Sequence, residues 1–112
     1  MSDDDPTKWK PATVEAVNDK VQKDFAACDA EQKAIFHRYF VEPHTTPILR
    51  YGRIETVIVV ARRGSEVVYW EDVEEGFNTS PVNDEGTIVE HWCNQDTLGM
   101  ALNRWIEGRP RH

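Results

Sequence analysis

The stretch VVYWEDVEEGFN, residues 67–78, places four carboxylates between Trp70 and Phe77. Acid–base catalysis needs two carboxyl groups whose pKa values are held apart in a cleft, and a metal site needs oxygen ligands that converge from several elements. Acids along one extended ribbon mostly point apart and meet water. We therefore interpret the stretch as a solvated strand or as a face that docks a partner, in preference to an active site.

The apolar side chains of this stretch do not follow a regular strand. Buried side chains in a strand lie two residues apart, so Val68 and Trp70 share one face. Val73 and Phe77 share the opposite face. One inserted residue near positions 71 and 72, a β-bulge, would bring all four to the same side. It would also turn three acids into a projecting rim, namely Glu71, Asp72 and Glu74.

An unbulged strand is the alternative. If Tyr69 and Phe77 point inward, then Glu71 and Glu75 must point inward as well. Buried carboxylates without partners are costly, so this version needs arginines beside them. The candidates are Arg50, Arg53 and Arg104.

The sequence HWC, residues 91–93, is the second candidate for chemistry. His91 and Cys93 would lie on one face of a strand and could bind a metal together with His37 or Cys28. Cys93 could instead act as a nucleophile, with His91, His37 or His44 as its base. Zinc sites usually contain tight pairs such as C-x-x-C, and no second pair is present. The pattern favours a half-buried histidine beside a core thiol, so we expect no metal and no cofactor, and we favour a non-catalytic protein over an enzyme.

The charge of the chain is unevenly distributed. The net charge of the 112 residues is −7, yet residues 50–64 carry four arginines against one glutamate, whereas residues 66–90 carry eight acids and no Lys or Arg. An acidic chain repels phosphate backbones, so nucleic-acid binding is disfavoured. No apolar run reaches the length of a membrane span, the first residues are acidic, and two cysteines fit buried thiols. We expect a soluble cytoplasmic protein.

Two helical patterns occupy the first 41 residues. A stripe from Val14 to Cys28 follows the helical period, and Asp29 with Gln32 forms a capping box that opens a second helix, ending near Val41. One long bent helix over residues 12–41 is the alternative. The last pattern is also helical, with Asn94 as its cap and one buried stripe: Leu98, Ala101, Leu102, Trp105 and Ile106.

Strand patterns lie between these helices. They are Ile54–Ala61, Val67–Trp70 and Thr87–Trp92, with little regular structure between Glu42 and Ile54 except a short extended piece at Ile48–Tyr51. The sequence therefore predicts an α+β fold with two N-terminal helices, an antiparallel meander of three to four strands, and a C-terminal helix packed on the sheet. We expect one domain over residues 1–112, with a frayed lead at 1–10 and a basic tail at 109–112.

These features favour a small acidic binding or regulatory protein, similar in physical character to immunity proteins or enzyme modulators. It would dock a basic partner through an acidic strand flanked by aromatic residues. An apolar sheet face left uncovered by helices would also favour a homodimer through the sheet. The alternative is an enzyme or ligand binder with a pocket between sheet and helices. The predicted partner-binding residues are Trp70, Glu71, Asp72, Glu74, Glu75 and Phe77.

Overall fold

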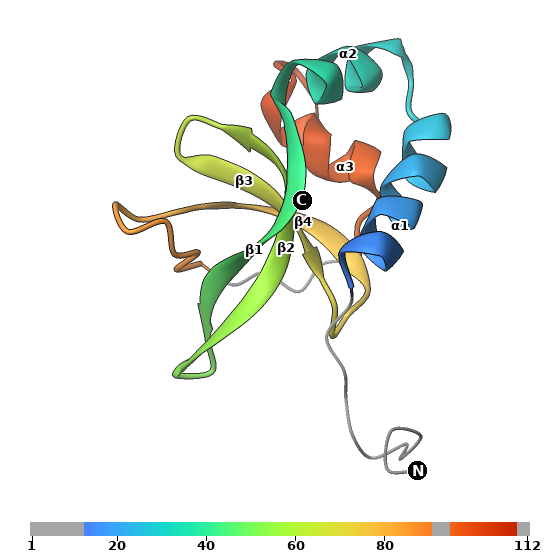
Figure 1. Ribbon diagram of the computed structural model, residues 1–112. Helices are drawn as coiled ribbons and strands as arrows, with labels where there is room; N and C mark the ends of the chain where they lie inside the picture. Colours follow the sequence, from blue (N-terminus) through green and yellow to red (C-terminus); the bar gives the residue numbers. More distant parts are fainter. Residues whose placement is uncertain (1–12, 91–94, 110–112) are drawn as a thin grey trace, which may run out of the picture.

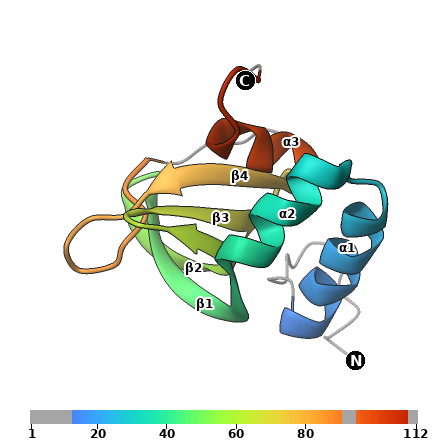
Figure 2. The same ribbon diagram turned by 90° about the horizontal axis from the view of Figure 1, so that it is seen from above.

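The computed structural model describes residues 13–90 and 95–109, which form an α+β fold with a four-stranded antiparallel sheet in the order β1-β2-β3-β4. Helices lie on one side of the sheet, and the segment that follows β4 (orange) lies on the other (Figures 1 and 2). The predicted fold class is thus confirmed. In chain order the elements are α1 (Val14–Ala26), α2 (Ala30–Tyr39), β1 (Phe40–Arg50), β2 (Arg53–Arg63), β3 (Glu66–Glu71), β4 (Gly76–Pro81), α3 (Leu98–Leu102) and the 3₁₀ helix η2 (Asn103–Trp105).

The N-terminal half contains two helices, because a capping box separates them. The amide of Gln32 donates to the Asp29 carboxylate at 2.8 Å, and the Gln32 side-chain oxygen accepts from the Asp29 amide at 2.9 Å. These two bonds satisfy amide groups that the first turn of α2 leaves without helical partners. The predicted capping box is confirmed, and the single bent helix is wrong.

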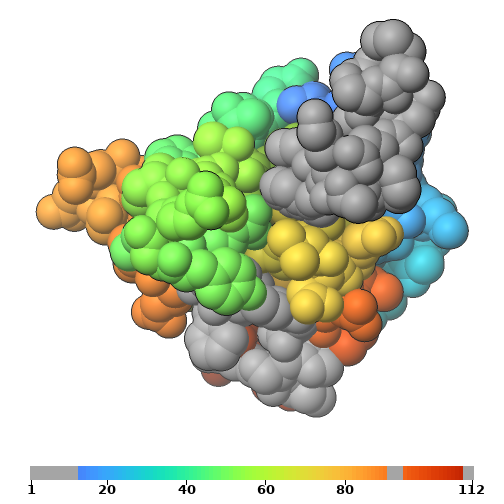
Figure 3. All heavy atoms as spheres, turned by 90° about the horizontal axis from the view of Figure 1, so that it is seen from below, coloured from blue at the N-terminus to red at the C-terminus, as the bar shows by residue number. Residues whose placement is uncertain are grey.

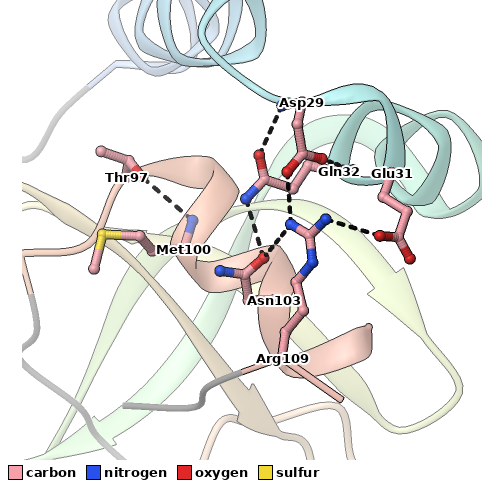
Figure 4. A network of polar contacts seen from close by, with 7 residues as sticks. All are labelled: Asp29, Glu31, Gln32, Thr97, Met100, Asn103 and Arg109. Atoms are coloured by element: carbon pink, nitrogen blue, oxygen red, sulfur yellow. Dashed lines mark hydrogen bonds and ion pairs between the residues drawn. The ribbon is translucent and has the colours of Figure 1, made fainter. Parts of the chain in front are cut away.

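The start of α2 is also joined to the C-terminal elements (Figure 4). The side-chain amide of Gln32 donates to the side-chain oxygen of Asn103 at 3.0 Å, and Arg109 forms ion pairs with Asp29 at 2.7 Å and Glu31 at 2.8 Å. The hydrogen bond from Arg109, followed by that from the backbone amide of Gln32, holds the pKa of Asp29 below its ordinary value. Arg109, which the sequence suggested as part of a tail, is therefore tied to the domain.

Strand β1 corrects the expectation of little regular structure before Ile54. It runs over 11 residues, Phe40–Arg50, although it contains Pro43 and Pro47. Proline lacks a backbone N–H and is tolerated on an edge strand, where one row of backbone groups has no strand partner. The carbonyl of Pro47 accepts from the amide of Ile88 at 2.9 Å, so Pro47 faces that outer edge.

The fourth strand is β4, and the predicted strand at Thr87–Trp92 is wrong within its described part. Strand β4 pairs with β3 in continuous register from Glu66 opposite Pro81 to Glu71 opposite Gly76. Ile88 makes only isolated bridges, one to Ile48 and one to Val82. His91 and Trp92 lie outside the described residues.

The sequence did not reveal β4 because three of its buried side chains are polar: Asn78, Thr79 and Ser80. The Thr79 hydroxyl donates to the Ala101 carbonyl of α3 at 2.9 Å, and the Ser80 hydroxyl donates to the Glu90 carbonyl at 2.7 Å. Buried hydroxyl groups are tolerated when they find such partners. Their bonds attach β4 to α3 on one side and to the following segment on the other.

The predicted bulge near positions 71 and 72 is wrong, and the irregularity lies in β2. Val59 pairs with Tyr69, but Ala61 pairs with Val68, so Val60 is an extra residue. A bulge shifts the alternation of side chains by one position. Val60 and Ala61 therefore both belong to the apolar cluster beneath the helices.

The sheet is covered on both faces. The main cluster joins the helices to the sheet. It contains four of the five residues of the buried stripe that we expected in the last helix, Leu98, Ala101, Leu102 and Trp105, and the fifth, Ile106, is also buried. The second cluster lies on the helix-free face, where Val82 and Ile88 cover five strand residues: Ile48, Val57, Val59, Val67 and Tyr69. The same chain thus covers the apolar face from which we expected a homodimer. Within the described ranges, no helix combines the length and apolarity needed to cross a membrane.

The C-terminal helix is shorter than its pattern suggested. Thr97 caps α3 by accepting from the Met100 amide at 3.2 Å, and the chain tightens into η2 after Leu102. The predicted cap, Asn94, lies outside the described residues. The indole of Trp105 donates to Glu66 at 3.0 Å, which fixes η2 against the start of β3.

Candidate docking surface

Two hairpin turns lie side by side at one end of the sheet, because alternate turns of an antiparallel meander point the same way. Figure 3 shows the β1–β2 turn (green) next to the β3–β4 turn (yellow). We call residues 49–55 and 71–76 the hairpin end. Its two tips contain Tyr51 at φ 54° and Glu75 at φ 58°, which are the non-glycine residues with positive φ in the described part of the chain.

A buried ion cluster lies beneath the hairpin end. The Arg50 side chain is 1% exposed and the Glu71 side chain is fully buried, and Nη1 of Arg50 donates to both carboxylate oxygens of Glu71 at 2.7 and 2.9 Å. Nε of Arg50 donates to Glu55, and Nη2 lies 3.4 Å from Asp72. Burial alone would lower the pKa of Arg50, but the hydrogen bond to Glu55 and the charge of Glu71 outweigh it and raise the pKa.

The strand period explains why these charges meet. Arg50 follows Ile48 by two residues, Glu55 precedes Val57 by two, and Glu71 follows Tyr69 by two, while the three apolar residues belong to the helix-free cluster. Side chains two apart share a face. The ion cluster is therefore the polar end of the second core, and it joins β1, β2 and β3.

The prediction of a projecting acidic rim is wrong for Glu71, because this side chain is fully buried. Its location agrees with the unbulged alternative, and Arg50 is its arginine partner. That alternative fails for Val73 and Glu75, which are exposed, because β3 ends at Glu71 and the chain turns at once. Of the other predicted partner-binding residues, Trp70 and Phe77 are buried and stack edge to face at 5.0 Å, whereas Asp72 and Glu74 are half-buried.

The exposed apolar residues of the hairpin end were missed in the sequence. Tyr51 is 76% exposed, Ile54 is 63% exposed and Val73 is 52% exposed, while Leu49 opposite Ile54 is also exposed. Five carboxylates and two arginines lie in the same two segments. The signal in the sequence was a glycine turn between apolar residues, LRYGRI, which we interpreted as irregular structure.

The pKa of Asp72 lies above its ordinary value, first because burial penalises the charged carboxylate; its contact with Arg50 opposes this shift, and the charge of Glu71 adds to it. With a raised folded-state pKa, the folded protein binds the proton more tightly than the unfolded chain. The contribution of Asp72 to the free energy of unfolding is therefore most favourable below the ordinary pKa of an aspartate. It is lost as the pH rises through the pKa of Asp72 in the folded protein.

We therefore expect Asp72→Asn to raise the Tm at neutral pH, because the amide carries no buried charge. The gain should disappear near about pH 3, where the aspartate itself is neutral. Thermal denaturation of both proteins across this range measures the difference. A lower Tm of the variant at neutral pH would show that the contact with Arg50 outweighs the cost of burial.

The other predicted chemistry is not assembled by the described residues. Cys28 is a buried free thiol whose pKa is raised, mainly by burial, and His37 packs edge to face on Phe25 at 5.3 Å. A raised thiol pKa disfavours the reactive thiolate. His91 and Cys93 lie outside the described residues, and within the described ones no three His, Cys, Asp or Glu side chains converge on a common point for a metal.

Packed apolar side chains fill the space between the sheet and the helices, where the alternative reading expected a pocket. Hollows lie instead among the helices. One of about 260 Å³ separates the α1–α2 connection from α3, and a groove of about 200 Å³ separates α1 from α2.

Comparisons with known proteins give no assignment to a class: no family model, no curated protein and no solved structure matches this chain.

Proposed function

We propose that this chain is a non-catalytic binding protein that docks a basic partner through the hairpin end. The observation that carries the proposal is the coincidence of exposed apolar side chains, an excess of carboxylates and backbone strain at one end of the sheet. Exposed aromatic residues supply contact energy in interfaces, and surrounding charges steer the encounter. A cytoplasmic location, where thiols stay reduced, agrees with the free thiol of Cys28.

The strain at Tyr51 supports a role beyond folding. A two-residue turn with positive φ at both positions, here Tyr51 at 54° and Gly52 at 72°, is normally formed by Asn-Gly or Asp-Gly. Tyrosine in the left-handed region costs roughly 1–2 kcal/mol. Such strain is found preferentially at functional sites, where another requirement compensates for it. We infer that contact with a partner is this requirement.

The buried ion cluster around Arg50 supports the same function, because it lies beneath the exposed residues of the hairpin end. It connects β1, β2 and β3 next to the two turns, so the exposed side chains project from a backbone that the cluster holds in place. A preorganised surface loses less conformational entropy when it binds. The role that we assign to Arg50 and Glu71 is therefore positioning, while the direct contacts come from Tyr51, Ile54 and the β3–β4 turn.

Affinity capture from the native cell tests the proposal with three proteins at low and high salt. The wild type is expected to retain a basic protein whose binding weakens with salt. The combined variant Glu74→Gln/Glu75→Gln should weaken retention by about two- to tenfold. The matched control, Asp84→Asn/Glu85→Gln, removes the same charge from an exposed turn outside the hairpin end and should retain the partner.

Tyr51→Asn separates binding from stability. Asparagine tolerates the left-handed conformation, so the variant should be as stable as the wild type or more stable, yet bind the partner more weakly. Salt-insensitive retention, or equal losses in the turn variant and its control, would contradict the proposal.

A further inference from the structure

The groove between α1 and α2 is a second candidate site, at the α-helical end of the molecule and independent of the hairpin end. Within the described ranges its lining consists of Val21, Gln22, Phe25, Phe36, His37 and Phe40. Its walls are a row of aromatic rings, with Phe36 at 5.8 Å from Phe25 and at 5.9 Å from Phe40 between ring centroids. Phe40 is 56% exposed although it is a large apolar side chain. Exposed apolar surface of this kind marks places where ligands or partners bind.

The packing of α2 explains why the groove stays open. Ile35, Phe36 and Tyr39 pack on the main core as partly buried side chains, whereas Phe40, the first residue of β1, is exposed. No residue of α2 is fully buried. The groove therefore receives the exposed ring of Phe40 beside Phe36, whose ring is only partly covered by the core.

The charged side chains around the groove favour one sign of charge on the ligand. None of the lining residues that the structure describes carries a carboxylate, although the chain has a net charge of −7. The Lys33 ammonium lies 5.6 Å from the Phe25 ring centroid, and the His37 ring contacts the same phenylalanine. Among the residues that the structure describes, no carboxylate lies within ion-pairing distance of Lys33.

A cationic ligand is the competing choice, because aromatic faces attract cations. Lys33 already lies over Phe25 and would repel a second cation, and no carboxylate among the described lining residues would compensate for that repulsion. An anionic head group would instead be attracted by the Lys33 ammonium beside Phe25. The anion is therefore favoured on electrostatic grounds.

We propose that this groove binds a small amphipathic carboxylate, whose apolar body lies between the phenylalanines and whose carboxylate pairs with Lys33. The groove has a volume of about 200 Å³, which is smaller than the roughly 300–1,000 Å³ of sites that hold drug-sized ligands. The smaller volume suits a short alkyl chain or one aromatic ring. Larger lipids would extend into solvent.

The test uses octanoate, 1-octanol and octylammonium as probes of one apolar body with three head groups, titrated into ¹⁵N-labelled protein. Octanoate is expected to bind saturably, with a Kd near about 1 mM or tighter, and to shift the amides of residues 21–25 and 36–40. The neutral alcohol should bind more weakly, and the cation weakest. Shifts elsewhere, no saturation, or equal binding of octylammonium would overturn the proposal.

Two variants connect the result to the groove. Lys33→Gln should weaken octanoate about two- to fivefold and leave octanol unchanged, since it removes one exposed ion pair. Lys20→Gln is the matched control, because Lys20 lies over Trp70 outside the groove, and it should change neither. Phe40→Ser, at an exposed position, should weaken both probes. Equal effects of the Lys33 and Lys20 variants would place binding elsewhere and contradict the assignment.

Discussion

Replacing Arg50 with methionine is expected to lower the free energy of unfolding by about 3–5 kcal/mol, because it leaves the fully buried Glu71 without its counter-charge. Domains of this size are stable by only about 5–15 kcal/mol, so a large part of the stability would be lost. Urea or guanidinium denaturation followed by tryptophan fluorescence measures the change.

The matched control is Arg53→Met, which removes an exposed arginine from the same hairpin and should change the stability by less than about 0.5 kcal/mol. The double variant Arg50→Met/Glu71→Met should recover much of the loss, because two apolar side chains can replace a buried ion pair. A loss below about 1 kcal/mol in Arg50→Met would show that water reaches Glu71 in the native protein.

Replacing Phe77 with alanine is expected to destabilise the protein by about 3–5 kcal/mol, because Phe77 is fully buried and packs against Trp70 in the main cluster. The sequence suggested Phe77 as a contact for a partner, at the surface. An exposed phenylalanine would cost little when truncated, so equilibrium denaturation distinguishes the two locations.

Val73→Ala provides the comparison from the adjacent turn. Val73 is 52% exposed, so its truncation should cost less than about 0.5 kcal/mol in the free protein. In the affinity capture, Val73→Ala should weaken binding of the partner, although it leaves the free energy of unfolding unchanged. A stable Phe77→Ala protein would mean that the β3–β4 hairpin is displaced from the core.

The elements that depend on local signals were predictable. The capping box at Asp29 requires only two side chains three residues apart, and the stripe from Leu98 to Trp105 follows the helical period. The apolar run Ile54–Ala61 likewise indicated a strand, and β2 covers it over Arg53–Arg63. In each case the information lies within one short segment.

The candidate surface was only partly predictable. The pattern placed acids near positions 71–75, and Glu75 is indeed exposed there; Val73, which we expected to point inward, is exposed as well. It could not place Tyr51 and Ile54 beside them, because they belong to another hairpin. It also assigned Glu71 to the surface as the preferred reading, since a glutamate is rarely fully buried unless it is paired.

The sequence by itself determined which segments are helical, which class the fold belongs to and which part of the chain carries the charge imbalance, because period, caps and composition are local properties. Only the tertiary structure decided that Pro47 lies on an edge strand, that the polar β4 closes the sheet, and that Arg50 meets Glu71. The physical reason is that burial turns a charge or hydroxyl from a solvated group into one that must find a partner. The partner often lies on another strand, and its separation along the sequence is too long for a short pattern to reveal it.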